Sequence, residues 1–376
     1  MKILIVRTHP TEIKIKTYNV QELGLAKALI SLGHQCDIML YTDSESHTED
    51  ISVFNRKQIR IYWTHGKNFL WQGIYNWKNL LDLASTYDYV QVNEYNQIAS
   101  FYITKMLPGK SYIYHGPYYN PKDRKYNSLN RMFDSLFLNK MIKQNPLVFA
   151  KSDMAEISLR EKGFQNVFTV GVGLDTGRFD NSEEDNEKSG MNCQYNLLYI
   201  GEISERRNTL FLIDVFHEVN NRLNSKARLR IIGKCADEYT NKVKKRVNEY
   251  KLQHFVEFID RKEQIELPEE YSRADLFVFP TNYDIFGMVL LEALYFGVPV
   301  VSSRNGGSAT LLDDGKCGCI VDTFDITKWT STIITILNDK QRMTDMGLNG
   351  KRRICESFTW EAIARKMLET IDRKMK

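Results

Sequence analysis

The 376-residue sequence contains no apolar run that approaches 18 residues, so we expect no transmembrane helix. Its first six residues, Met1–Val6, are too short an apolar stretch for a signal-peptide core and predict a β-strand instead. The six cysteines lack the spacing of a disulfide framework, and Cys317-Gly318-Cys319 has no second Cys/His pair nearby to complete a metal site. These absences argue against a secreted disulfide scaffold and favour a reducing cytoplasm.

No nucleic-acid-binding motif is present, although the net charge is +4 and unevenly distributed. Residues 1–180 carry 22 Lys and Arg against 17 Asp and Glu, and the excess is concentrated in residues 102–143. Basic residues interleaved with aromatic ones are typical of contact with a membrane surface, and also of a solvated face with core aromatics between the charges. We expect no nucleic-acid partner, and peripheral contact with the inner face of the cell membrane through Lys105, Lys110, Lys122, Arg124, Lys125, Arg131, Lys140 and Lys143.

The length exceeds the roughly 250–300 residues at which a single core usually splits, so two domains are expected. Short apolar runs alternate with segments of helical periodicity in both halves, which predicts βαβ units around parallel sheets. Residues 181–190 are polar and acidic without periodicity, which indicates a linker. We therefore predict an α/β chain with domains at 1–180 and 196–358, a linker at 181–195 and an amphipathic helix within 359–376.

The most informative stretch follows the predicted strand Leu276–Phe279, where Phe286-Gly287 opens a helix. In an open α/β sheet, ligands bind at the carboxyl ends of the strands, and a helix N-terminus there offers N–H groups to an anion. Asp284 and Glu292 stand eight residues apart, at the mouth of this helix and two turns along it. Two such carboxylates can hold sugar hydroxyls at two points, whereas an ordinary strand–turn–helix unit is the alternative interpretation.

This pattern resembles the acid-x7-Glu signature of the retaining, nucleotide-sugar-dependent glycosyltransferases of family 4, which have the GT-B fold. Further segments resembling the family are Val170–Phe179, Leu198–Asn208, Ile231–Lys234 and Phe258–Arg261, so that the resemblance covers nearly the whole chain. It implies two Rossmann-like doubly wound domains that face each other across a cleft, a closure hinged near residues 175–195, and a last helix that crosses back to the first domain.

The resemblance implies a donor site in the second domain. Arg206 and Arg207 would neutralise the diphosphate, although Glu202 occupies the position where the family usually has Arg. Asp284, in place of the more usual Glu, would hold a sugar hydroxyl, and Glu292 would bind the ribose. The full predicted donor set is Gly201, Arg206, Arg207, Gly233, Lys234, Arg261, Asp284, Ile285, Phe286, Gly287 and Glu292, with the amides of 285–287 directed at the donor. For Arg206, Arg207 and Lys234, exposed surface cations are the alternative.

In the first domain, His115 follows an apolar strand and resembles the family's histidine beside the donor sugar. The predicted catalytic residues are thus His115, Asp284 and Arg207, and the predicted acceptor-side residues are Thr8, His9, Tyr18 and His115. Asp43-Ser44-Glu45 imitates a metal-binding Asp-x-Asp motif, but we interpret it as part of a polar loop that also holds His47 and Glu49. No cofactor and no metal are therefore expected.

The function implied is transfer of a sugar, from a UDP-sugar by preference, to a hydroxyl of a glycan acceptor with retention of configuration. A lipid-linked acceptor in bacterial surface polysaccharide assembly, such as capsule formation, fits the basic stretch. Three alternatives stay open: the same fold with a small soluble acceptor, a nucleotide-sugar epimerase, and a non-catalytic nucleotide-sugar-binding partner subunit.

Overall fold

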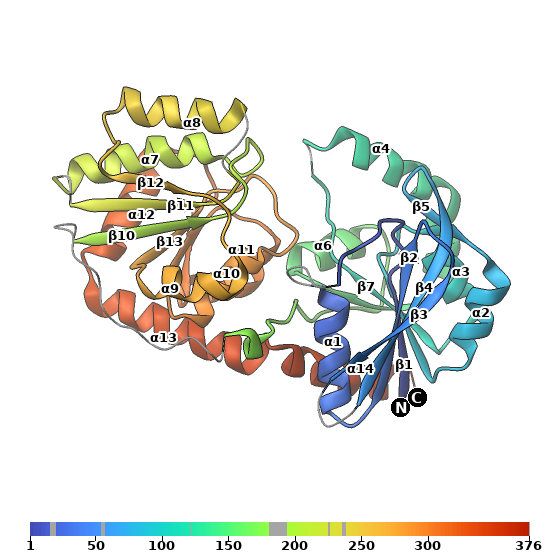
Figure 1. Cartoon of the computed structure of the whole chain (residues 1–376). Coiled ribbons are helices and arrows are strands. Elements are labelled where there is room, and N and C mark those ends of the chain that lie inside the picture. The colour runs from blue at the N-terminus through green and yellow to red at the C-terminus, as the bar shows by residue number, and fades with distance from the viewer. Residues whose placement is uncertain are drawn as a thin grey trace. The chain divides into compact units, whose positions relative to one another are not determined.

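The computed structural model describes residues 1–15, 20–53, 57–120, 122–179, 194–224, 226–234 and 238–375. It divides the chain into two compact units (Figure 1). The N-terminal unit comprises Met1–Gly173 together with Thr359–Lys376, and the C-terminal unit comprises Leu174–Phe358. Most of the predicted linker lies outside the described residues. The predicted acceptor-side residue Tyr18 also lies outside them.

The sheet of the N-terminal unit has the strand order β3-β4-β2-β1-β6-β7-β8-β9, with β5 paired to β4. β3 and β5 run antiparallel to β4, and the other neighbours are parallel. The strands are β1 (Lys2–Val6), β2 (Gln35–Thr42), β3 (His47–Ser52), β4 (Gln58–Phe69), β5 (Gln72–Tyr75), β6 (Tyr89–Asn93), β7 (Ser111–His115), β8 (Leu147–Ala150) and β9 (Val167–Thr169).

The helices of this unit cover both faces of its sheet, with α1 and α14 packed together on one face (Figure 1). The opposite face carries the main apolar core, built from strand residues such as Leu4 and Val92 and from helix residues such as Leu80 and Ile103. The helices are α1 (Gln21–Ser31), α2 (Trp77–Ser85), α3 (Ile98–Met106), α4 (Arg124–Phe133), α5 (Asn139–Lys143), α6 (Asp153–Glu161) and α14 (Trp360–Lys374), with a π-helical turn, η2 (Asp134–Leu138), between α4 and α5.

The C-terminal unit is a parallel sheet in the order β12-β11-β10-β13-β14-β15. Its strands are β10 (Tyr195–Ile200), β11 (Ala227–Ile232), β12 (Val256–Ile259), β13 (Leu276–Phe279), β14 (Val300–Ser302) and β15 (Gly318–Ile320). Its helices are α7 (Thr209–Arg222), α8 (Glu238–Glu249), α9 (Leu267–Ser272), α10 (Met288–Tyr295), α11 (Gly306–Leu311), α12 (Ile326–Leu337) and α13 (Lys340–Ser357).

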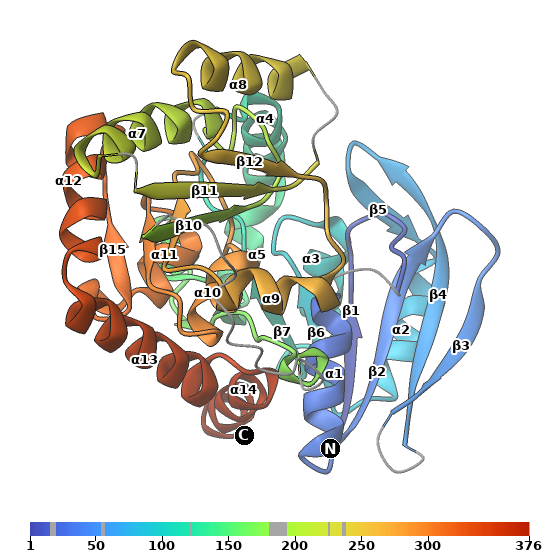
Figure 2. The ribbon, with the colours of Figure 1, turned by 60° about the vertical axis from the view of Figure 1, so that its left-hand side comes forward.

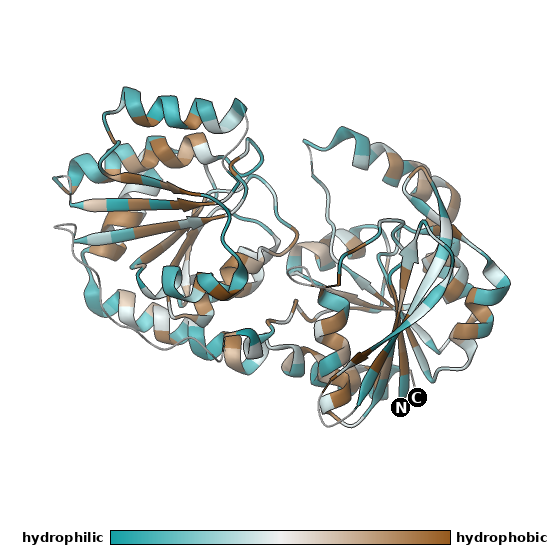
Figure 3. Cartoon of the chain, in the orientation of Figure 1, coloured by the Kyte–Doolittle hydropathy of each residue, from teal (hydrophilic) through white to brown (hydrophobic). Residues whose placement is uncertain are grey.

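Helices lie on both faces of this second sheet, α7 and α8 on one and α9 and α10 on the other (Figure 2). Its central strand β13, Leu-Phe-Val-Phe, is buried along its whole length, as expected for a parallel strand covered on both faces. Apolar residues are concentrated in the strands, and α8 is mostly polar (Figure 3).

The strand order of each sheet reverses at one point. In the N-terminal unit the chain proceeds from β1 to β2 on one side and returns to β6 on the other, so the reversal lies between β1 and β6. In the C-terminal unit it lies between β10 and β13. Ligands of doubly wound sheets bind at the carboxyl ends of the strands on either side of such a point. From the topology we therefore expect ligand sites at the loops after β1 and β6, and at those after β10 and β13.

The structure corrects one local expectation. His47 and Glu49, which we assigned to a polar loop, lie on β3, an edge strand whose side chains are nearly all exposed. Among the helices in the described part of the chain, none combines the length and the apolar character needed to cross a membrane.

Candidate functional site

The loops after β10 and β13 are tied together by hydrogen bonds. The backbone amide of Asn282 donates to the carbonyl of Arg206 at 2.9 Å, and its side-chain amide donates to the carbonyl of Glu205 at 3.0 Å. In return, the Arg206 guanidinium donates to the carbonyl of Tyr283 at 3.1 Å. The two loops at the reversal point of the C-terminal sheet thus form one structural element.

Arg207 and Asp284 form an ion pair between these loops, with only 17% and 13% of their side chains exposed. The second carboxylate oxygen of Asp284 accepts the amides of Phe286 at 3.1 Å and Gly287 at 2.7 Å. The Arg207 guanidinium also lies 5.0 Å from the centre of the Phe279 ring. Asp284 therefore holds both the arginine and the turn that leads into α10.

Glycines allow backbone segments to approach closely at this edge. A Cβ added at Gly233, after β11, would lie 1.9 Å from the carbonyl oxygen of Gly201, after β10. A Cβ at Gly307, in the first turn of α11, would lie 1.5 Å from the carbonyl oxygen of Phe286. Gly287 itself has φ = 73°, in the left-handed region that favours glycine. The shape of the edge thus depends on the absence of side chains at these positions.

Glu292, on α10, is 1% exposed. Its carboxylate accepts a hydrogen bond from the Tyr271 hydroxyl at 2.8 Å and a longer one from the Gln264 amide at 3.4 Å. A buried carboxylate needs such partners because burial without them costs several kcal/mol. The structure thus gives Glu292 a network within its own unit.

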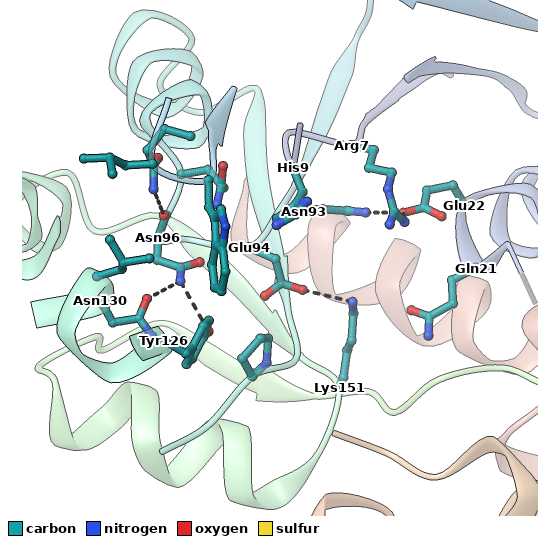
Figure 4. A pocket seen from close by; sticks show the side chains of 16 residues that line it. Arg7, His9, Gln21, Glu22, Asn93, Glu94, Asn96, Tyr126, Asn130 and Lys151 are labelled. Carbon is teal, nitrogen blue, oxygen red and sulfur yellow. Dashed lines mark hydrogen bonds and ion pairs between the residues drawn. The ribbon is translucent and has the colours of Figure 1, made fainter. Parts of the chain in front are cut away.

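A cavity of about 480 Å³ lies at the reversal point of the N-terminal sheet (Figure 4). It is lined by residues that follow the carboxyl ends of three strands: Arg7 and His9 after β1, Glu94 after β6 and Lys151 after β8. This volume is within the range of about 300–1,000 Å³ typical of small-molecule sites.

Glu94 and Lys151, which line this cavity, belong to a buried charge cluster. The Glu94 carboxylate lies 3.2 Å from Lys151 Nζ and 2.6 Å from His115 Nδ1, and it accepts the Gly116 amide at 3.2 Å. Burial alone would raise the pKa of Glu94, but Lys151, His115 and the Gly116 amide outweigh it and lower this pKa to about 2. Glu94 also has φ = 64°, a strained conformation for a non-glycine residue and one that is often found at functional sites.

A second charge pair lies across the cavity (Figure 4). Arg7 contacts the carboxylate of Glu22 at 3.0 Å, and the Asn93 side-chain amide donates to the same oxygen at 2.6 Å. Burial and the nearby Arg7 both lower the pKa of His9, so its imidazole is neutral near pH 7. The cations at this edge are thus already neutralised by protein carboxylates.

Residues 181–353 match the model of the family described as glycosyl transferases group 1. The chain carries a glycosyl transferases group 1 domain. The match includes every predicted donor residue, and the expected relationship to this family is confirmed. The first domain of the chain lies outside the matched segment.

Curated relatives agree with this assignment. The GDP-mannose-dependent alpha-(1-6)-phosphatidylinositol monomannoside mannosyltransferase of Mycolicibacterium smegmatis is 27% identical over 53% of this chain and 54% of its own length. A probable sucrose-phosphate synthase of Thermosipho melanesiensis is 25% identical over 55% of this chain and 48% of its own length. The chain thus spans about half the length of these relatives.

Solved structures extend the likeness to the whole chain. Anabaena Alr3699/HepE in complex with UDP superimposes with a TM-score of 0.75 at 16% identity, covering 99% of this chain and 100% of that one. At this identity the likeness concerns the fold alone, and it confirms the predicted GT-B class.

Within the group 1 domain, the structure brings several predicted residues together and separates others. Arg206, Arg207 and Asp284 belong to the linked loops, and the predicted amides of Phe286 and Gly287 already donate to Asp284. Phe286 is buried, whereas Ile285, Lys234 and Arg261 are exposed. Glu202 is exposed and lies 3.4 Å from Arg206, so it partly neutralises the cation expected to replace the family's Arg. Their roles in donor binding stay predictions.

The predicted acceptor-side residues lie in different environments of the N-terminal unit. His9 lines the cavity, whereas Thr8 is fully buried and its hydroxyl donates to the carbonyl of Asn93. His115 is 3% exposed, and it lines a neighbouring cavity of about 280 Å³ rather than the first one. Its predicted role beside the sugar stays a prediction.

The sequence reasoning missed Glu94 and Lys151, two charged residues in contact that line the N-terminal cavity. Each follows the end of a strand, Glu94 after β6 and Lys151 after β8. The same positional rule that drew attention to His115 would have found both, since each is the first charged residue beyond an apolar strand.

Proposed function

We propose that the chain transfers a sugar from a nucleotide diphosphate sugar, a UDP-sugar by preference, to a hydroxyl of a glycan acceptor with retention of configuration. The observation that carries the proposal is the linked pair of loops at the reversal point of the group 1 domain, which joins Arg207 to Asp284. Structural neighbours with UDP and UDP-glucose bound support the choice of donor.

The roles follow from the chemistry of each side chain. Arg206 is exposed and only loosely paired with Glu202, whereas Arg207 would have to give up part of its contact with Asp284; together they would supply the positive charge that stabilises the departing diphosphate. Asp284 positions a sugar hydroxyl, and Glu292 accepts hydrogen bonds from the ribose. In the retaining reaction, the acceptor oxygen attacks from the leaving-group side, and the departing phosphate oxygen takes the acceptor proton. His115 would support positive charge at the sugar as the glycosidic bond breaks.

The proposal extends to a lipid-linked acceptor in bacterial surface polysaccharide assembly. The eight cations of residues 102–143 are all exposed, which supports membrane contact. Several aromatics of the same stretch, Tyr112, Tyr114 and Phe133, belong to the core, but Met132 and Leu136 are 44% and 58% exposed. Arg124, Ser128 and Met132 follow each other at four-residue spacing on α4, and this stripe is the part of the surface that would meet the membrane.

Co-sedimentation with vesicles of anionic and neutral lipids tests this extension. Reversing the charge of Arg124 and Lys140 should abolish binding to anionic vesicles, because each exposed cation contributes about 1 kcal/mol at such a surface. Equal binding of the wild type to neutral and anionic vesicles, or undiminished binding of the variant, would leave a soluble acceptor as the better proposal.

The central experiment compares two buried glutamates of the same unit, Glu292 and Glu270, each 1% exposed. Glu292→Gln should weaken binding of UDP, GDP or dTDP by about tenfold, whichever nucleotide the wild type prefers. The carboxylate that accepts hydrogen bonds from the ribose is replaced by an amide, in which only one of the two end atoms can accept. Glu270 pairs with Arg230 and Lys262 and has no assigned role, so Glu270→Gln serves as the matched control.

Turnover distinguishes the remaining alternatives. A transferase should hydrolyse its donor slowly without an acceptor and form a product whose anomeric configuration, read by NMR, is that of the donor. Interconversion of two nucleotide sugars without release of nucleotide would instead indicate an epimerase. Nucleotide binding with no hydrolysis under any condition would indicate a binding subunit, and unchanged binding in Glu292→Gln would refute the donor-site assignment.

A further inference from the structure

We propose that the cavity of the N-terminal unit binds an uncharged pyranose ring of the acceptor, stacked on Trp71, and that it discriminates against phosphorylated sugars. This inference rests on the proposed function, because it specifies the class of acceptor for the same reaction. It goes beyond that function because the relatives named above, a phosphatidylinositol monomannoside mannosyltransferase and a probable sucrose-phosphate synthase, do not fix the acceptor of this chain.

The charge of the cavity argues against an anionic ligand. Its two cations, Arg7 and Lys151, lie 3.0 Å from Glu22 and 3.2 Å from Glu94. A phosphate would have to compete with both carboxylates for their partners and would lie close to two negative charges. Like charges in a partly buried site repel strongly. The formal charge of these four groups cancels, which suits a neutral ligand.

The hydrogen-bonding groups of the cavity suit hydroxyls. Amide side chains both donate and accept, as hydroxyls do. They contribute a large share of the lining: Gln21, Gln72, Asn93, Asn96, Gln97 and Asn130. Several of them are fixed by neighbours; for example, the Asn96 amide donates to the Tyr126 hydroxyl at 3.3 Å, and Gln72 donates to the carbonyl of Asn96 at 3.1 Å (Figure 4). A sugar would therefore meet groups that are already oriented.

Three buried atoms of lining residues have no hydrogen-bond partner among the described residues: Arg7 Nε, Glu22 Oε2 and Gln97 Oε1. Two of them are acceptors that need a donor, and the third is a donor. A buried polar atom left without a partner costs about 1–3 kcal/mol. Sugar hydroxyls can donate to the two acceptors and accept from Arg7, whereas the phosphate group of a phosphorylated sugar has no hydrogen to donate and could serve only Arg7.

Trp71 supplies an apolar surface at the mouth of the cavity. It belongs to the tight turn between β4 and β5, where Leu70 and Trp71 have φ values of 49° and 66°. These are strained conformations for residues with large side chains. Trp71 is 38% exposed and has Lys125 Nζ 5.0 Å from its ring centre. An exposed indole beside polar amides can cover the apolar face of a pyranose while the amides bind its hydroxyls.

Ligand-observed NMR titration of the full chain, with and without saturating UDP, tests the inference. The probes are the methyl α-pyranosides of glucose, galactose, mannose and N-acetylglucosamine, together with glucose 6-phosphate and mannose 6-phosphate. At least one neutral pyranoside should bind about tenfold more tightly than either phosphorylated sugar. Tighter binding of a phosphorylated sugar, or binding of no pyranoside in either condition, overturns the proposal.

Two substitutions in the same hairpin locate the binding. Trp71→Ala should weaken pyranoside binding by about tenfold, as expected for loss of an aromatic contact and its buried area. Phe69→Ala removes a ring that is 63% exposed and does not line the cavity, and it should leave binding unchanged. Equal effects of the two substitutions would show that the hairpin acts only through stability and would refute the role of Trp71.

Nucleotide binding, measured in the same samples, separates this inference from the proposed function. Binding of UDP without binding of any pyranoside would refute the acceptor class and leave the donor site in place. Binding of a pyranoside without any nucleotide would refute the proposed transfer reaction but support the cavity as a sugar site.

Discussion

Both units place their candidate residues at the reversal point of a doubly wound sheet. The C-terminal unit shapes that edge with backbone groups, whereas the N-terminal unit forms it with side chains. In the C-terminal unit the edge is shaped by backbone, because Gly201 lies against Gly233, and Gly307 against Phe286, at distances that no Cβ would allow. In the N-terminal unit it is formed by side chains, above all the cluster of Glu94, which holds Lys151 and His115.

This difference determines what each site tolerates. A site formed by close backbone approach is sensitive to added volume, and in the C-terminal unit the Arg207–Asp284 ion pair adds sensitivity to the loss of either charge. A site formed by a buried charge cluster is sensitive to the loss of any one charge and to protonation of Glu94. The comparison can be tested by disturbing each edge in the manner to which it should be most sensitive.

The largest effect is expected from Lys151→Met, which removes a cation that is 10% exposed and leaves Glu94 without it. Removal of one partner of a buried ion pair costs about 3 kcal/mol, because an uncompensated buried charge remains. The free energy of unfolding, from urea denaturation, measures this loss. Glu94→Gln introduced into Lys151→Met should recover part of it, and simple addition of the two losses would show that the residues act independently.

The pH dependence of stability provides a second measurement on the same cluster. Because the pKa of Glu94 is lowered to about 2 from an ordinary 4.5, its contribution to stability is complete above pH 4.5 and declines as the pH falls towards 2. Between about pH 5 and pH 3, the wild type should therefore lose more stability than Glu94→Gln. Parallel profiles for the two proteins would mean that the carboxylate is not stabilised in the folded state.

The backbone-shaped edge should respond to one added methyl group. Gly307→Ala places a Cβ 1.5 Å from the carbonyl oxygen of Phe286, so the turn before α10 must shift. Overpacking of this kind costs about 2 kcal/mol, and displacement of the turn should also weaken nucleotide binding. Thermal unfolding and nucleotide titration measure the two effects.

Gly315→Ala is the matched control within the same unit. Gly315 has φ = 91° and no neighbour within 4 Å of an added Cβ, so alanine there meets backbone strain without a clash. The expected cost is about 1 kcal/mol, with nucleotide binding unchanged. An equal loss of nucleotide binding in both variants would mean that binding follows stability rather than the position of the Phe286 turn.

The same contrast explains which parts of the structure could be predicted. Strands of the parallel sheets could be predicted because they are apolar runs bounded by turns; the strand expected within residues 1–6 is β1, and the strand expected at 276–279 coincides with β13. A backbone-shaped site carries a local signature of glycines and fixed spacing. The stretch from Asp284 to Glu292 could therefore be identified within a single segment.

The N-terminal cluster has no such signature, because Arg7, Glu22, Glu94, His115 and Lys151 come from separate segments and meet only through the topology. β3 was also missed, since its sequence His-Thr-Glu-Asp-Ile-Ser lacks the apolar alternation of a half-buried strand. The turn before β5 has Leu70 and Trp71 in conformations for which the sequence gives no glycine signal. The charge cluster, strand β3 and this turn all depend on tertiary packing rather than on local sequence.

The smallest effect is expected at Glu202, the acidic residue at the family's usual arginine position. Its side chain is 57% exposed and its ion pair with Arg206 is long, so Glu202→Gln should change stability by less than about 0.5 kcal/mol. Removing a negative charge beside the diphosphate should instead raise nucleotide affinity by about threefold, and 1 M salt should abolish the gain. Glu249→Gln makes the same charge change at the last residue of α8, at the opposite edge of the sheet, and should not alter affinity. Unchanged or lower affinity in Glu202→Gln would place the diphosphate away from this turn, and the backbone-shaped edge would then need another source of positive charge.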